Sequence, residues 1–246
     1  MERKPARSGA VDTLRGDHSA TGTVIDLREF GDPLDGPLPG GIEVAGGRYI
    51  RRVKPVIDWL LALVALILVL PVMVLVATVV FVSLGRPIVL RQERVGRGGQ
   101  LFTVFKFRTM HPDRRRRPGM FDGSDRRRTH KHPEDPRLTP SGRLLRKLSL
   151  DELPQLFNVL RGDMSLVGPR PELPHIVDAY YEPWQHRRHA VKPGITGLWQ
   201  ISERGNGMMH EHVDVDLDYV DQVGLGTDLW IMARTLPAAL SSRQGY

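Results

Sequence analysis

The sequence contains no cysteine. This absence excludes a disulfide scaffold, a cysteine zinc site, an iron–sulfur cluster and a thiol nucleophile. Charge is also missing from one long stretch, because no Asp, Glu, Lys or Arg occurs between residues 59 and 85. A membrane-spanning helix needs about 20 predominantly apolar residues. The segment 51–85 is therefore predicted to be a membrane helix, and a buried helix of a soluble protein is the weaker alternative.

The chain has 246 residues, which is enough for one domain with tails or for two small domains. Its 35 Lys and Arg residues exceed its 28 Asp and Glu residues, which gives a formal net charge of +7. This excess favours anionic partners such as phosphates, acidic lipids or nucleic acid, without choosing between them. Residues 1–50 lack hydrophobic periodicity, and we expect them to form a disordered or loosely held tail that is not a secretory signal.

Two features bear on how the apolar helix lies in the membrane. Pro71 stands near its middle and lacks a backbone N–H, so a kink or break is expected there. Basic residues flank both ends, and such residues tend to stay on the cytoplasmic side. A re-entrant helix that enters, breaks at Pro71 and returns to the cytoplasm fits both features. A plain tilted span, with one basic flank outside, is the alternative.

The segment after this helix is strongly basic. Residues 87–92 and 101–107 are rich in β-branched and aromatic side chains and are separated by glycines, which predicts a small β-hairpin. The arginine runs 114–117 and 126–128 predict a solvated loop that binds anionic membrane lipid. No recognised nucleic-acid motif accompanies these runs, so we do not expect nucleic acid as a partner.

Apolar residues repeat at helical spacing in residues 141–163, which predicts one or two amphipathic helices around Asp151 and Glu152. One interpretation of this pair is structural, with Ser149 capping a helix and Glu152 bonding back to it. The other interpretation is chemical. Basic residues and a helix N-terminus attract phosphate, carboxylates beside phosphate suit Mg²⁺, and a carboxylate can also attack phosphorus directly.

Three segments carry distinctive motifs, which are QERVGRGGQLFTVFKFRTM, DPRLTPSGRLLRKLSLDELPQLFNVLRGDMSLVGPRPELP and KPGITGLWQISERG. Together with KPVID and the apolar run, they resemble the bacterial sugar transferases. Within that family they are similar to the polyprenyl-phosphate glycosyl-1-phosphate transferases with a single re-entrant helix. The resemblance extends from about residue 54 to residue 219.

The resemblance implies transfer of a sugar-1-phosphate from a UDP-sugar to polyprenyl phosphate, usually undecaprenyl phosphate, with release of UMP. It also implies Mg²⁺ and a ping-pong route. Asp151 would be the nucleophile that forms a phosphosugar-aspartyl enzyme, and Glu152 would help to hold Mg²⁺ or handle the acceptor proton. Both residues are metal candidates. The remaining candidates for contacts with or near the substrate are Arg146, Lys106, Arg108, Arg170, Arg204 and Asp163.

We therefore expect an α+β fold, mostly helical, with a re-entrant membrane helix and surface amphipathic helices. Residues 86–246 would form a catalytic domain on the cytoplasmic face of the bacterial inner membrane, acting at the first membrane step of glycan assembly (exopolysaccharide, O-antigen, capsule or glycoprotein). A homo-oligomer is compatible with this arrangement. Two alternatives stay open: a membrane-anchored basic module that binds anionic lipid or nucleic acid, and a metal-dependent phosphohydrolase.

Overall fold

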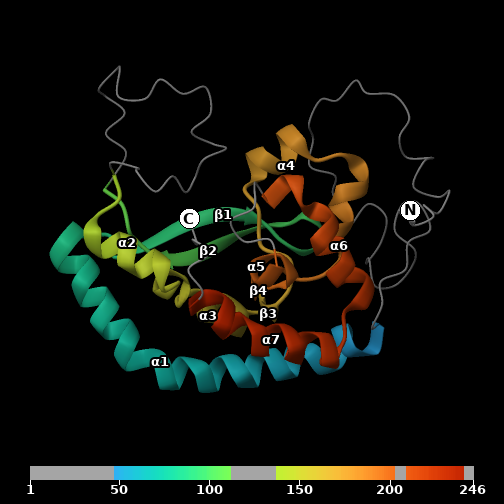
Figure 1. Cartoon of the computed structure of the whole chain (residues 1–246), viewed down its shortest axis with the longest axis horizontal. Coiled ribbons are helices and arrows are strands. Elements are labelled where there is room, and N and C mark those ends of the chain that lie inside the picture. Colours follow the sequence, from blue (N-terminus) through green and yellow to red (C-terminus); the bar gives the residue numbers. More distant parts are fainter. Residues whose placement is uncertain (1–46, 112–136, 203–208, 241–246) are drawn as a thin grey trace, which may run out of the picture.

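The computed structural model describes residues 47–111, 137–202 and 209–240. Most of the predicted tail, the arginine runs 114–117 and 126–128, and Arg204 lie outside the described residues. Within them the protein is mostly helical with two small sheets (Figure 1), so the expected fold class is confirmed at that level. Helical structure begins before the predicted boundary at residue 51, because a π-helical segment, Tyr49–Val53, precedes the long apolar helix.

The apolar helix α1, Lys54–Leu84, contains Pro71 and changes direction along its length (Figure 1). The helix is therefore bent, as expected where a proline removes one backbone hydrogen bond, but it is not interrupted. Among the described residues, one helical stretch, Tyr49–Leu84, is long and apolar enough to cross a membrane. Only 17% of its most apolar window is buried, which argues against the core helix of a soluble protein.

Both ends of α1 are bound to the same folded body. At its start, the Nζ of Lys54 lies 2.6 Å from the Oδ2 of Asp228 in helix α7, Leu225–Leu240. Asp58 accepts a hydrogen bond of 2.6 Å from the hydroxyl of Ser165. At the end of α1, the buried Arg108 guanidinium donates to the carbonyl of Leu84, which the last turn leaves unpaired, and to the carbonyls of Gly85 and Arg86 just beyond it.

Strands β1, Val89–Val95, and β2, Leu101–Phe107, form an antiparallel pair in which Val89 faces Phe107. Side chains alternate between the two faces of this sheet. Helix α3, Gln155–Arg161, lies along the free edge of β2, where the fully buried Asn158 bonds to the backbone. Its amide nitrogen donates to the carbonyl of Thr103 at 2.7 Å, and its amide oxygen accepts from the N–H of Phe105 at 3.1 Å.

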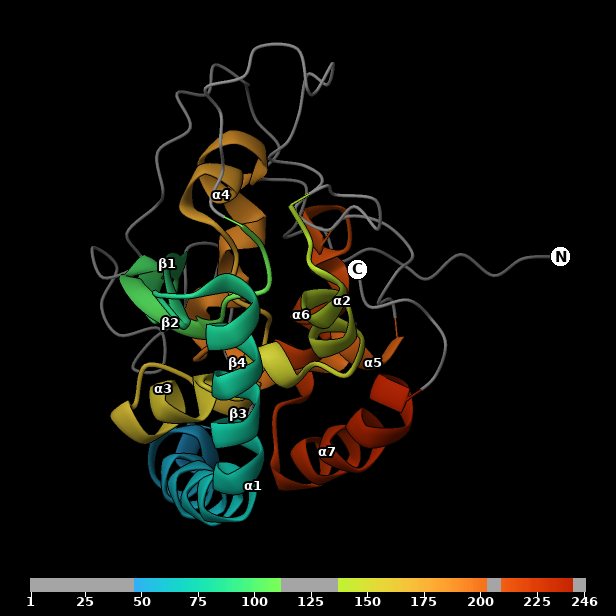
Figure 2. The same cartoon turned by 90° about the vertical axis from the view of Figure 1, so that its left-hand side faces the viewer.

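The remaining elements complete the body around this sheet. A second, parallel pair joins β3, Ser165–Val167, to β4, Gly194–Thr196, and was not predicted because each strand has only three residues. The other helices are α2 (Pro140–Lys147), α4 (Pro174–Tyr180), α5 (Leu198–Ser202) and α6 (Val213–Gln222). Buried apolar clusters tie α1 to β2, α2 and α3, and both views place α1 and α7 along the same side of the molecule (Figure 1 and Figure 2).

Candidate active site

A short 3-10 turn, Leu150–Glu152, carries the adjacent carboxylates between α2 and α3. Ser149 precedes it in the left-handed conformation, with φ of 55°, which costs a non-glycine residue about 1–2 kcal/mol. The Ser149 side chain makes no capping hydrogen bond to this turn, and the Glu152 carboxylate is directed at two cations. The capping interpretation is therefore wrong, and the strained residue stands beside the pair of carboxylates, as strained backbone often does at functional sites.

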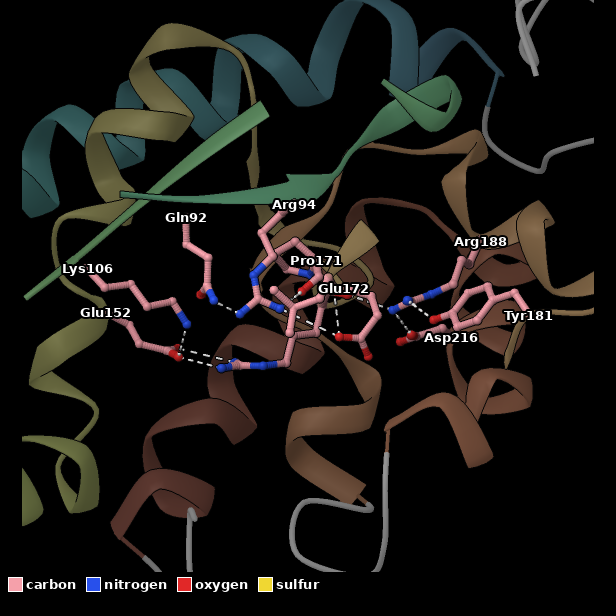
Figure 3. A network of polar contacts seen from close by, with 11 residues as sticks. Gln92, Arg94, Lys106, Glu152, Pro171, Glu172, Tyr181, Arg188 and Asp216 are labelled. Atoms are coloured by element: carbon pink, nitrogen blue, oxygen red, sulfur yellow. Dashed lines mark hydrogen bonds and ion pairs between the residues drawn. The ribbon is translucent and has the colours of Figure 1, made fainter. Parts of the chain in front are cut away.

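Glu152 is held between Lys106 of β2 and Arg170 of the loop after β3. Figure 3 shows its contact with Lys106. Its Oε1 lies 3.1 Å from the Nζ of Lys106 and 2.5 Å from the Nη2 of Arg170, and its Oε2 lies 3.3 Å from Nη1. Burial lowers the pKa of Lys106, although the charge of Glu152 opposes that shift. Burial acts in the same direction on Arg170, but the carboxylates around it, with Glu152 first, together outweigh burial and raise the arginine's pKa.

Asp151 belongs to the same electrostatic cluster. It is half-buried, and its charge raises the pKa of both Lys106 and Arg170, after the larger effects of burial and of Glu152. Two adjacent carboxylates beside two buried cations are suited to a phosphorylated substrate. Mg²⁺ prefers one or two carboxylates together with phosphate oxygens. Asp151 and Glu152 fit that donor set, and the described residues contain no group of three or more ligand-type side chains around a common point.

A second row of polar side chains lies behind Arg170. Arg94 of β1 donates to the side-chain oxygen of Gln92 at 2.8 Å and to the carbonyl of Pro171 at 3.4 Å. Its Nη1 also lies 3.6 Å from the Oε1 of Glu172. Burial lowers the pKa of Arg94 to about 10, with Glu172 acting against the shift and Arg170 adding to it. Gln92, Arg94 and Lys106 therefore form a polar face of the sheet (Figure 3).

The network continues to a buried ion pair between Arg188 and Asp216 (Figure 3). Arg188 also donates to the backbone carbonyl of Arg170 at 2.7 Å and to the hydroxyl of Tyr181 at 2.5 Å. The side chains of Arg188 and Asp216 are each only 1% exposed. The pair therefore fixes the backbone from which Arg170 reaches Glu152.

Sequence motifs did not indicate this second row. The sequence did contain a signal for Gln92 and Arg94. These residues alternate along β1, so both lie on the same face of the sheet as Lys106 of β2. Glu172 follows the GPRP motif closely but resembles an ordinary surface acid in sequence. Asp216 was one of several acids in residues 214–221, and only the packing of α6 against residues 183–190 distinguishes it.

The other predicted site residues lie in different places. The Nε of Arg146 donates to the Oγ1 of Thr109 at 2.9 Å, just beyond the end of β2. Arg108 is directed at the end of α1, and no described contact joins it to Glu152. Asp163 lies at the opposite end of α3 from the turn with Asp151. It forms an ion pair with Arg161, whose side chain is largely exposed. The structure therefore brings together Asp151, Glu152, Lys106 and Arg170.

An apolar helix bound at both ends to one body, with paired carboxylates among buried cations, is typical of a membrane-associated enzyme that acts on phosphorylated substrates. Comparison with known proteins defines the class further. The family model described as bacterial sugar transferase matches residues 49–242, and the chain belongs to this family.

Several curated relatives are similar over most of the chain. The exopolysaccharide production protein ExoY of Sinorhizobium fredii is 41% identical over 84% of this chain and 92% of the relative. The UDP-glucose:undecaprenyl-phosphate glucose-1-phosphate transferase of Caulobacter vibrioides is 38% identical over 87% of this chain and 82% of the relative. The undecaprenyl-phosphate galactose phosphotransferase of Salmonella typhimurium is 37% identical over 81% of this chain and 43% of the relative.

Proposed function

We propose that this protein transfers a sugar-1-phosphate from a UDP-sugar to polyprenyl phosphate and releases UMP. The observation that carries the proposal is the position of Glu152, held between Lys106 and Arg170 directly beside Asp151. The names of the Caulobacter and Salmonella relatives support the same reaction type. Those names differ in the sugar, so glucose and galactose are both candidate groups. Exopolysaccharide assembly is the favoured pathway, because the ExoY relative carries that name.

In the proposed reaction, a carboxylate oxygen of Asp151 attacks the sugar-bearing phosphorus of the UDP-sugar. The bond from that phosphorus to the bridging oxygen breaks, and UMP leaves with the oxygen. A phosphate oxygen of polyprenyl phosphate then attacks the same phosphorus, the bond to Asp151 breaks, and the carboxylate is restored. Two displacements at one phosphorus allow a single small anionic site to serve both substrates in turn.

The buried cations would stabilise the negative charge that gathers on the phosphoryl oxygens. Lys106 and Arg170 already face the carboxylate pair and are the first candidates for this role. Arg146, Arg108, Arg204 and Asp163 stay predictions as direct or indirect substrate contacts. When bound, Mg²⁺ would be held by Asp151 and Glu152 and would reduce repulsion between the nucleophile and the diphosphate.

The membrane topology is part of the proposal. Because Lys54 and Arg108 attach the two ends of α1 to one body, a re-entrant helix fits better than a span with ends on opposite sides. Exposed Leu225, Leu229 and Trp230 on α7 would rest on the same bilayer surface. We infer a location on the inner membrane with the carboxylates facing the cytoplasm, where nucleotide sugars occur and anionic lipid attracts basic segments.

The test is UMP release by the purified chain with Mg²⁺, across UDP-sugars, with and without undecaprenyl phosphate. We expect multiple turnovers only with the lipid and with one preferred sugar. Asp151→Asn should abolish UMP release while membrane binding is retained, and Asp214→Asn, at an exposed position of α6, should behave as wild type. Release of inorganic phosphate would favour the phosphohydrolase alternative. No release from folded protein with any donor would favour the membrane-anchored binding module.

A further inference from the structure

We propose that an apolar groove on the second face of the β1–β2 sheet binds the isoprenoid units next to the phosphate of the lipid acceptor. This inference rests on the proposed function and adds a site for one of its substrates. The groove has a volume of about 1240 Å³. Its walls are contributed by α1, both strands and the start of α3, and include Met73, Val89, Phe105, Phe107, Pro154 and Phe157.

Apolar side chains are exposed in the groove, whereas a surface that faces water would normally keep them buried. Val89 is 36% exposed and Phe157 is 42% exposed, and both lie in its lining. None of the described residues that line the groove is acidic. A connected apolar surface of this kind is a common mark of a binding site for an apolar ligand.

The groove connects the membrane helix with the carboxylate pair. At one side, Met73 belongs to α1 and lies two residues beyond Pro71. At the other side, Pro154 follows closely after Asp151. The chain between them is tightly turned, because the N–H groups of Glu152 and Leu153 donate to the carbonyls of Ser149 and Leu150. A chain seated in the groove would therefore run from the bilayer to the turn that carries the nucleophile.

The edge of β2 explains how one ligand can reach both faces of the sheet. Lys106 and Phe105 are neighbours in the strand, so Lys106 is directed at Glu152 while Phe105 lines the groove. Asn158 holds α3 against the free edge between these faces. The residues around Asp151 thus meet the cations on one face and the groove on the other.

Charge complementarity identifies the occupant as an amphiphile with an anionic head. Arg86 and Arg91 belong to the groove lining, and the Cζ of Arg91 lies 5.9 Å from the ring centroid of Phe105. An isoprenoid phosphate has an apolar chain for the aromatic wall and a negative group for the cations. The first units of this chain must leave the bilayer for their phosphate to reach Asp151, and the groove would keep their methylenes out of water.

The experiment separates the two half-reactions in the purified full-length chain, kept in one detergent. The groove variants are Val89→Ser and Phe157→Ser, and the matched control is Leu101→Ser, which changes an exposed leucine at the start of β2 outside the groove. The burst of UMP without lipid measures the first step and shows that each variant is folded. Steady-state transfer to undecaprenyl phosphate and to the shorter farnesyl phosphate measures the second step.

We expect wild-type bursts in all variants and an increase of about tenfold in the KM for lipid in the two groove variants. The increase should be similar for both lipids, because the groove holds the units that they share. Unchanged KM values in the groove variants would overturn the site while leaving the proposed function intact. An increase for undecaprenyl phosphate alone would also overturn it, because that pattern indicates altered partitioning of the long chain. Absence of UMP release by the wild type, both with and without lipid, would instead reject the proposed function itself.

Discussion

Lys106 and Glu152 form an ion pair of 3.1 Å across 46 residues of sequence. The pair joins the polar face of the β1–β2 sheet to the turn that carries Asp151. Both side chains are about 15% exposed or less, so water screens the interaction only weakly. A buried cation in this position can exchange part of its contact with Glu152 for a substrate phosphate without moving far. In the proposed reaction, the pair would be the point at which the fold prepares the site for an anion.

We expect Lys106→Met to reduce kcat/KM for the UDP-sugar by about 100-fold or more, since a positioned cation at a reacting phosphate contributes at least that much. Lys106→Arg should recover part of the loss, because it restores the charge with a different geometry. Initial rates of UMP release give the measurement. Lys147→Met, on the exposed face of α2, is the control and should stay near the wild-type rate. Equal rates for both Met variants would show that Lys106 has no role in the reaction.

The sequence and the folded structure hold different information about this site. The apolar pattern predicted the long helix and the bend at Pro71. The family resemblance implied that Lys106 and Arg170 share a site with the two carboxylates, but it implied the same for Arg108 and Asp163, which lie elsewhere. The capping role of Ser149 was wrong because tertiary cations outcompete a local backbone bond for Glu152. Local patterns also could not indicate the Arg188–Asp216 pair, because its partners are 28 residues apart and meet only through the packing of α6. Burial and long-range pairing decide such features.

The Arg188–Asp216 pair makes a prediction about stability. Asp216→Asn removes one charge and leaves Arg188 buried without its counter-ion, which should cost about 3–5 kcal/mol of unfolding free energy. Asp221→Asn is the matched control, because it breaks the pair between Asp221 and Arg187, in which the Asp221 side chain is 46% exposed. Such exposed pairs contribute about 1 kcal/mol or less. Thermal unfolding in one detergent compares the variants. Equal losses of stability would show that burial does not make the Arg188–Asp216 pair contribute more than the exposed pair.

His186 predicts how stability depends on pH. Burial, followed by the nearby charge of Arg188, lowers its pKa from 6.5 to about 4 in the folded protein. Between these values the unfolded chain binds a proton that the folded protein does not, so stability is lost as the pH falls from 6.5 towards 4. The contribution is fully present above pH 6.5. Acidification from pH 7 to pH 5 should therefore cost about 2 kcal/mol through this residue.

The measurement for His186 is the unfolding free energy at pH 7 and pH 5 for the wild type and for His186→Gln. The variant should lose less stability on acidification, whatever its stability at pH 7. His111→Gln, which changes an exposed histidine, should retain the wild-type dependence. A wild-type pH dependence in His186→Gln would show that other groups, such as the buried His189, dominate the acid response.

The absence of cysteine makes the topology of α1 directly testable, because any introduced thiol is the only one in the chain. Arg48→Cys lies before the helix and Glu93→Cys after it, and both positions are exposed. The re-entrant arrangement predicts that neither thiol reacts with a membrane-impermeant maleimide in spheroplasts with an intact inner membrane. Both should react once that membrane is opened. Labelling of one position alone in intact spheroplasts would establish a span with its ends on opposite sides. In that case, the contacts of Lys54 with Asp228 and of Arg108 with the end of α1 could not both exist in the membrane.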